Sequence, residues 1–306
     1  MSDSREVKIE MARRLWCWTP HPTQAQWLLA DAKTKVAACG RRWGKTKAAA
    51  IDAAVTALDQ QGFRQMIVSP SYDQSRLIVD EIDRLISPIE KFKNIYKFTK
   101  TPYPLIEIGE SVISARTADD DGRNLRGNWA DRVIVDEAAF VKDSVINEVI
   151  GPMLADKNGE LVLISTPFGR NHFYRSFMRG QSCKDGRCIS FTFPSVSNPH
   201  ISREFIESQR EILTQRQFAV EYEAQFIEDI NAVFPSADIQ RAVRCVDIQE
   251  SKWTTIGIDW ARYSDYTALV AMRENAVVDI ERMNNLPWNV QIERAVEFIK
   301  RNGGNT

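Results

Sequence analysis

A short stretch, CGRRWGKTK at residues 39–47, carries the residue types that bind phosphate groups. Its last part, GKT at residues 44–46, matches the end of the phosphate-loop consensus G-x-x-x-x-G-K-[ST]. In that consensus, backbone amides surround the phosphates, the lysine reaches the terminal phosphates and the hydroxyl holds Mg²⁺. Cys39 stands where the consensus has its first glycine, and glycine comes one place later. We interpret the stretch as a working but variant nucleotide loop formed by Gly40, Arg41, Arg42, Gly44, Lys45 and Thr46.

Two further polar groups follow apolar runs. RVIVDE, residues 132–137, delivers Asp136 and Glu137 at the end of a predicted strand. Ligands of open parallel sheets bind at that edge, so Asp136 could hold Mg²⁺ through water and Glu137 could polarise the attacking water. Together with the nucleotide loop, this pair indicates hydrolysis of a nucleotide. Residues 165–167, Ser-Thr-Pro, could sense the γ-phosphate, but taken alone they are better explained as a strand-ending turn.

The elements that must position these side chains alternate between strands and helices. A strand before the nucleotide loop and a helix after it are the context that a phosphate loop requires. Short apolar strands between amphipathic helices predict an α/β fold, with a mostly parallel sheet covered on both faces. The expected strands are residues 35–39, 65–70, 132–137 and 160–167, with residues 188–193 a further candidate. The expected helices are 45–61 and 73–86, and residues 105–114 predict a hairpin turning at Gly109-Glu110.

Composition and net charge limit the classes of protein to which the chain can belong. The 306 residues are 43% hydrophobic, which is enough for at least one full core, and the net charge is -1. Any surface for nucleic acid must therefore be a local basic patch. Five irregularly spaced cysteines indicate reduced thiols, and the charged amino terminus and lack of a long apolar run indicate a soluble intracellular protein. Candidate DNA contacts are Arg203, Arg210 and Arg216, although a solvated helix face explains them more simply.

Taken together, these segments resemble the large terminase subunit, the DNA-packaging motor of tailed bacteriophages. GRRWGKT is similar to the family's variant phosphate loop, in which an arginine follows the start and the first glycine is often absent. LRGNWADRVIVDEAAF, residues 125–140, is similar to the family's region around the acid pair. QMIVSPSYDQSR and QRQFAVEYEAQFIED also look like family segments. The resemblance covers nearly the whole chain and implies an ATPase of the P-loop (ASCE) type.

The resemblance also implies roles for single residues. Arg41 would be the arginine that contacts the phosphates within its own subunit. Asp136 would be the magnesium-holding acid and Glu137 the catalytic one. Ser165, Thr166 and Pro167 match the coupling motif, which is thought to relay hydrolysis to movement.

Two positions leave alternatives open. HPTQ, ending at Gln24, resembles the family's adenine-reading motif, but Gln26 competes for the role. Arg126 stands where some family members insert an arginine finger into a neighbouring subunit, which is worth roughly 10³ to 10⁵ in rate. Arg123 competes with it, and either arginine could simply neutralise the acids at 119–121.

Beyond residue 228 the character of the sequence changes. Residues 231–252 are irregular and polar, and residues 254–272 resemble the opening hairpin of the family's RNase H-like nuclease domain. There, acids from separate strands hold two Mg²⁺ or Mn²⁺ ions that activate water and stabilise the leaving oxygen. Asp259 would be the first ligand and Asp265 a weaker candidate, since an acid in a turn is a serious alternative. The expected division is an ATPase domain at 1–228, a linker at 229–250 and the beginning of a nuclease domain at 251–306.

We expect the nuclease half to be incomplete. The resemblance predicts further strands with a second and a third acid, and no Asp or Glu follows Glu297. The chain is therefore expected to hydrolyse ATP without cutting DNA. The implied cofactors are ATP and Mg²⁺. The implied partners are double-stranded viral DNA, the portal protein, the small terminase subunit and further copies in a homo-oligomeric ring, a pentamer, on the procapsid in the host cell cytoplasm, away from membranes.

Two other classes remain open from the residues alone. A DEAD/DEAH-like helicase also has DEA after a strand, but it needs a second ATPase-like domain. A non-catalytic assembly subunit would use the nucleotide only to lock a conformation, and phosphate release separates that class from an ATPase.

Overall fold

The computed structural model describes residues 4–227, 241–243, 254–261, 265–274 and 276–303. The chain divides into two compact units, residues 1–235 and 236–306, and each has its own sheet. Most of the expected linker at 229–250 lies outside the described residues. Among the described residues, no helix is long and apolar enough to cross a membrane.

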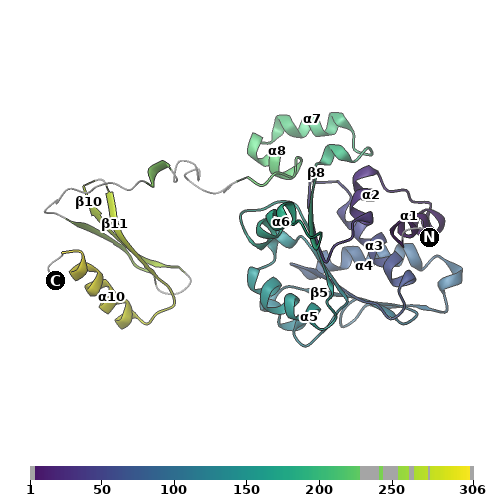
Figure 1. The fold of residues 1–306 in the computed structure, drawn as a ribbon, viewed down its shortest axis with the longest axis horizontal. Helices are drawn as coiled ribbons and strands as arrows, with labels where there is room; N and C mark the ends of the chain where they lie inside the picture. The colour runs from purple at the N-terminus through teal and green to yellow at the C-terminus, as the bar shows by residue number, and fades with distance from the viewer. Residues whose placement is uncertain (1–3, 228–240, 244–253, 262–264, 275, 304–306) are drawn as a thin grey trace. The chain divides into compact units, whose positions relative to one another are not determined.

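The first unit is built on an eight-stranded sheet in the order β3-β4-β5-β2-β6-β7-β1-β8. Figure 1 shows this unit with helices on both sides of its sheet. The strands from β5 to β8 in this order run parallel, and β3 and β4 are antiparallel additions at one edge. This confirms the mostly parallel α/β fold. The strands are β1 (Thr34–Cys39), β2 (Arg64–Ser69), β3 (Tyr96–Thr99), β4 (Leu105–Ile108), β5 (Ser111–Thr117), β6 (Arg132–Asp136), β7 (Glu160–Ser165) and β8 (Cys188–Phe193).

The helices of this unit start where the sequence offers caps. His21 caps α2 and Ser71 caps α4 through side chains that accept from backbone amides. The predicted hairpin is also present, because β4 and β5 pair antiparallel around Gly109, whose φ of 59° favours glycine. The helices are α1 (Ser4–Trp16), α2 (Pro22–Leu29), α3 (Lys45–Asp59), α4 (Tyr72–Ile86), α5 (Gly151–Ala155), α6 (His172–Ser182), α7 (Arg203–Ile212) and α8 (Gln215–Glu221).

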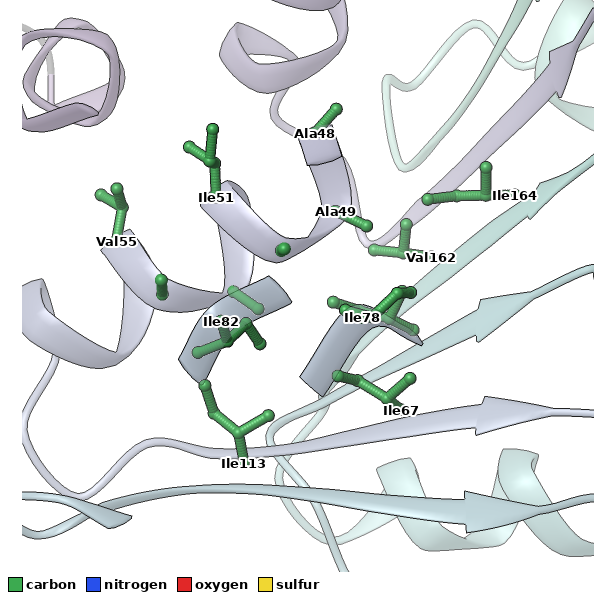
Figure 2. Close-up of a cluster of buried hydrophobic side chains, with 14 of the residues drawn as sticks. Ala48, Ala49, Ile51, Val55, Ile67, Ile78, Ile82, Ile113, Val162 and Ile164 are labelled. Carbon is green, nitrogen blue, oxygen red and sulfur yellow. The ribbon is translucent and has the colours of Figure 1, made fainter. Parts of the chain in front are cut away.

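Helices cover both faces of the sheet. On one face, alanines bring α3 close to the strands, and Figure 2 shows Ile51 of α3 and Ile78 and Ile82 of α4 above Ile67 of β2 and Ile113 of β5. The other face packs against α6 and against a π-helical turn, η4 (Val145–Ile150), that continues into α5. Strands buried on both faces explain why these segments are almost continuously apolar in the sequence.

A group of charged residues lies within the first unit near the amino ends of the parallel strands. Asp52 of α3 is fully buried; its Oδ1 lies 2.7 Å from Lys8 Nζ, and its Oδ2 lies 3.2 Å from Arg132 Nη1 and 3.7 Å from Lys35 Nζ. Arg132 also pairs with Glu160 at 2.7 Å. Burial alone would raise the pKa of Asp52, but the surrounding cations hold it far below its ordinary value. We call these five residues the basal charge cluster.

The second unit is smaller. β9 (Thr255–Asp259), β10 (Thr267–Arg273) and β11 (Ala276–Met283) form an antiparallel sheet in the order β11-β10-β9. α10 (Trp288–Arg301) contributes to the same core, in which Phe298 packs with Leu269 and Ala271.

Candidate nucleotide-binding site

The nucleotide loop joins β1 to α3 at the carboxyl end of the parallel strands. Cys39 still belongs to β1, because it pairs with Phe193 of β8, and burial raises the pKa of its thiol. The chain turns only at Gly40, where a Cβ atom would lie 2.5 Å from Ser195 Oγ and 2.6 Å from the Tyr222 carbonyl oxygen. The first tight position of the loop is therefore Gly40, which is why its glycine comes one place late.

The loop ends where α3 begins. Gly44 has a φ of 101°, a conformation that favours glycine, and no side chain caps the first amides of α3. The uncapped amides and the helix dipole make this end of a fifteen-residue helix suited to an anion. Lys45 and Thr46 open the helix, so the sequence-predicted loop has the backbone that phosphate binding needs.

Lys45 joins three elements at this edge. Its Nζ donates to Glu137 Oε1 at 3.0 Å and to Thr166 Oγ1 at 3.1 Å. Ser165 Oγ donates to Glu137 Oε2 at 3.3 Å, so the ends of β6 and β7 meet the start of α3. The structure thus brings together the predicted loop lysine, the predicted catalytic acid and the hydroxyls of the stretch that ends in Pro167.

The two acids after β6 differ in their surroundings. Asp136 is buried, and burial, followed by the adjacent charge of Glu137, raises its pKa to about 6 although Lys45 opposes the shift. Glu137 is partly exposed and has a φ of 49°, in the left-handed region. Strained backbone of this kind is often found at functional sites, where the surrounding structure holds it in place. Here it turns the Glu137 side chain toward Lys45.

The two arginines of the loop face different partners. Arg41 Nε donates to Glu221 Oε2 at 2.6 Å, and its backbone amide donates to the Glu221 carbonyl oxygen at 2.6 Å. Arg42 is exposed, has a φ of 64°, and its carbonyl oxygen accepts from Asn198 Nδ2 at 2.7 Å. Arg41 therefore lies against the end of α8.

Gln24 lies beside the loop, whereas Gln26 is exposed. A Cβ atom at Gly44 would be 2.6 Å from Gln24 Nε2, and Gln24 Oε1 accepts from the His21 amide at 3.3 Å. His21 Nε2 is 3.1 Å from the carbonyl oxygen of Trp43 in the loop. The geometry favours Gln24 over Gln26 as a contact of the nucleotide site.

Two residues that hydrogen-bond to Arg41 of the loop, Ser195 and Glu221, were not predicted from the sequence. Ser195 Oγ donates to the Arg41 carbonyl oxygen at 2.6 Å, and its amide donates to the Tyr222 carbonyl oxygen at 2.7 Å. Glu221 pairs with Arg41, and it lies in a segment for which the sequence showed only a resemblance to the family. The sole signal was the family-like run QRQFAVEYEAQFIED, which contains Glu221 and Tyr222.

Arg126 is exposed and has no contact with the nucleotide loop of its own chain among the described interactions. It follows η2 (Asp120–Leu125) and lines a depression of about 250 Å³ with Glu148 and Asp156. Within the described residues, no ion pair joins Arg126 to a carboxylate, whereas Arg123 does have an interaction. That Arg126, rather than Arg123, acts as an arginine finger on another subunit therefore stays a prediction.

The predicted nuclease acids lie on either side of the β9–β10 connection. Asp259 ends β9 opposite Ala268, and the Asp265 carboxylate accepts from the Tyr266 amide at 3.0 Å. Residues 262–264 between them lie outside the described part of the chain. Within the described residues, no group of three or more His, Cys, Asp or Glu side chains is placed to hold a metal ion.

Residues 37–241 of the chain match the model of the family described as "Terminase large subunit, T4likevirus-type, N-terminal". The chain is 29% identical to the terminase large subunit of Thermus virus P23-45 over 90% of this chain and 65% of that protein. It is 25% identical to the terminase large subunit of Escherichia phage T5 over 68% of this chain and 49% of that protein. The chain thus spans 65% or less of the length of these relatives.

Solved structures agree with this match. The large terminase ATPase domain of Thermus phage P74-26 is similar with a TM-score of 0.62 and 27% identity, over 70% of this chain and 97% of that one. The HK97 bacteriophage large terminase has a TM-score of 0.64 at 17% identity, over 97% of this chain and 72% of that one. The large terminase of bacteriophage D6E, in complex with ADP, has a TM-score of 0.53 at 12% identity, over 98% and 74%. The last two likenesses concern the fold alone.

Proposed function

Because the chain belongs to the large terminase subunit family, we propose that it is the ATP-hydrolysing subunit of a motor that packages double-stranded viral DNA into a procapsid. The observation that carries this proposal is the position of Lys45 Nζ, 3.0 Å from Glu137 and 3.1 Å from Thr166 at the start of α3. This position brings a phosphate-binding lysine into contact with an acid able to orient water and with a hydroxyl of the expected coupling segment.

ATP and Mg²⁺ fit the residues at this point. Gly40 and Gly44 let the loop pass close to Ser195, Tyr222 and Gln24, where a Cβ atom would collide. The first amides of α3 have no side-chain cap, and Thr46 and Asp136 supply the oxygen ligands that Mg²⁺ prefers. The raised pKa of Asp136 is consistent with a buried carboxylate that gains from a nearby cation. D6E large terminase, a structural relative, was solved with ADP and with ATP-γ-S.

Each residue of this site would then have its own role in nucleotide binding or hydrolysis. The α3 amides and Lys45 would hold the β- and γ-phosphates, and Thr46 and Asp136 would hold Mg²⁺, which neutralises charge on the phosphates. Glu137 would accept a proton from the attacking water or orient it. Lys45 must leave Glu137 to reach the phosphates, which frees the carboxylate for that task. Gln24 would contact the adenine, and Arg41 would exchange Glu221 for phosphate.

The remaining parts of the proposal concern the assembly. The DNA partner, the portal protein, the small terminase subunit and a ring of copies on the procapsid in the host cytoplasm follow from family membership. We further propose that residues 251–306 begin a nuclease domain in which Asp259 binds Mg²⁺ or Mn²⁺. The three-stranded second unit is unlike the second ATPase-like domain that a DEAD/DEAH-like helicase needs.

ATP turnover of three variants tests the function. Lys45→Ala should abolish turnover because the phosphates lose their cation, and Glu137→Gln should bind ATP but slow hydrolysis by about 10²- to 10⁴-fold. Lys47→Ala is the matched control, since Lys47 lies on the same helix but pairs with Glu81 of α4. Turnover should be followed as phosphate release, and ATP binding by calorimetry, with and without duplex DNA. Near-normal hydrolysis in folded Lys45→Ala and Glu137→Gln proteins would end the ATPase proposal.

A further inference from the structure

Two cavities lie beside β5, and Tyr103 and Arg116 line both of them. The smaller cavity is also lined by Ser114 of β5, and the larger by Ala115 of β5 and by Tyr72 at the start of α4. The larger cavity has a volume of about 340 Å³ and the smaller one of about 130 Å³. We call these two adjacent cavities together the β5 groove; their principal lining residues are Arg64, Tyr72, Tyr103, Arg116, Asn124 and Trp129.

Cations in the β5 groove stack on aromatic rings. The Arg116 guanidinium carbon lies 3.1 Å from the centroid of Tyr103, and that of Arg64 lies 4.6 Å from the centroid of Trp129. Lys157 Nζ approaches the same Trp129 ring at 5.2 Å. Tyr103 and Trp129 are 37% and 39% exposed, so the stacked pairs lie at the surface. Stacking fixes the guanidinium planes while leaving their N–H edges free to bind.

These guanidinium groups have no carboxylate partner within the described residues. Arg116 Nη1 donates to the Ala115 carbonyl oxygen at 3.1 Å, and burial lowers the pKa of Arg116. The nearby Asp131 carboxylate accepts from the Arg64 backbone amide at 2.8 Å instead of pairing with its side chain. Several other exposed arginines are paired with carboxylates, among them Arg14, Arg84 and Arg187. Arg210 on α7, for example, lies 3.3 Å from Glu223 and 3.5 Å from Glu207.

A positively charged groove without acidic partners fits a polyanion. Arginine edges held in place by rings match phosphate oxygens in a bidentate manner, and most protein–DNA contacts are made to phosphates. Asn124 and the hydroxyl of Tyr72 add neutral polar contacts along the same groove. A protein interface would be expected to have an apolar centre depleted of charge, and the β5 groove has cations there instead.

We propose that the β5 groove binds the sugar–phosphate backbone of duplex DNA, with Arg116 and Arg64 as the principal phosphate contacts. The proposal rests on the proposed function, because the DNA is the polymer that the ATPase would move. It assigns DNA contact to the β5 groove in place of the arginines of α7 and α8. Neither Arg116 nor Arg64 touches the nucleotide loop, so ATP hydrolysis without DNA does not depend on them.

Binding of the full chain to a short fluorescein-labelled duplex of random sequence tests the proposal. Anisotropy should show that Arg116→Gln and Arg64→Gln each weaken binding about threefold to tenfold. Each change should also lower the slope of log affinity against log salt by about 0.9, as expected for one lost phosphate contact. Tyr103→Leu keeps the charge but frees Arg116, so it should weaken binding less than Arg116→Gln does. Arg84→Gln is the matched control, because Arg84 lies on α4 and pairs with Glu81.

The outcomes are separable. DNA affinity and salt slope equal to wild type in folded Arg64→Gln and Arg116→Gln proteins would overturn the β5 groove as the DNA contact. An effect on self-association by sedimentation, with unchanged DNA binding, would make the groove a subunit interface and also overturn the proposal. If Arg116→Gln fails to fold, exposed Arg64 still decides the question. Basal phosphate release reports on the ATPase proposal independently, since it should match wild type in both variants.

Discussion

Two lysine–carboxylate groups lie at opposite ends of the same sheet, and they are built differently. The basal charge cluster surrounds a fully buried Asp52 with three cations. At the nucleotide edge, Lys45 and Glu137 are partly exposed, at 13% and 24%, and Glu137 has a left-handed backbone. The difference indicates that the first group stabilises the fold, while the second is held so that its partners can be exchanged.

The largest effect is expected from removing an arginine that would complete the nucleotide site of a neighbouring subunit. If Arg126 acts on a neighbouring subunit, Arg126→Ala should lower ATP turnover by roughly 10³- to 10⁵-fold. Turnover of the wild type should then rise more than linearly with protein concentration. Mixing inactive Arg126→Ala with inactive Glu137→Gln should restore some activity at shared interfaces. Arg123→Ala serves as the comparison, and absence of complementation in proven oligomers would argue against the role.

The next largest effect is expected at the other end of the sheet. Asp52→Asn leaves Lys8, Lys35 and Arg132 without their shared anion, so we expect a loss of about 3–5 kcal/mol in the free energy of unfolding. Turnover per folded molecule should change little. Because the folded pKa of Asp52 is depressed, the difference from wild type should be full above about pH 4 and shrink as the pH falls below it. Urea unfolding at several pH values measures this. Loss of turnover without loss of stability would reverse our assignment of the two groups.

A smaller effect concerns Lys35 in the same cluster. Burial lowers the pKa of Lys35 to about 8 in the folded chain from an ordinary value of 10.5. Between these pH values the unfolded chain binds more protons, so this group makes the folded state more stable as the pH rises. The free energy of unfolding of wild type minus that of Lys35→Met should therefore increase between pH 8 and 10. A flat difference over that range would mean that Lys35 is not desolvated as the structure indicates.

Much of the sheet could be predicted from the sequence because strands buried on both faces must be apolar. Residues 35–39, 65–70 and 132–137 were expected as strands and correspond to β1, β2 and β6. The nucleotide loop was also predictable, since its residue types must follow a strand and open a helix. The assignments of Arg41, Gln24, Arg126 and Asp259 stay predictions.

The partners of the loop could not be predicted because the contacts are distant in sequence. Arg41 and Glu221 are 180 positions apart, and Ser195 and Arg41 are 154 positions apart. Asp52 gave no signal either, because a single acid in an alanine-rich helix is typical of an exposed position. Only the three-dimensional packing of α1, β1 and β6 around it makes it a buried charge.

One consequence of the basal charge cluster concerns mechanics. Lys45 and Asp52 lie on the same helix, seven residues apart, which is about 10 Å along α3. If α3 slid by one turn, Asp52 would leave its three cations, so the cluster opposes axial movement of the helix. α3 is therefore expected to behave as a rigid rod fixed near its middle. A load applied at the nucleotide end of α3 would therefore be passed to the base of the sheet.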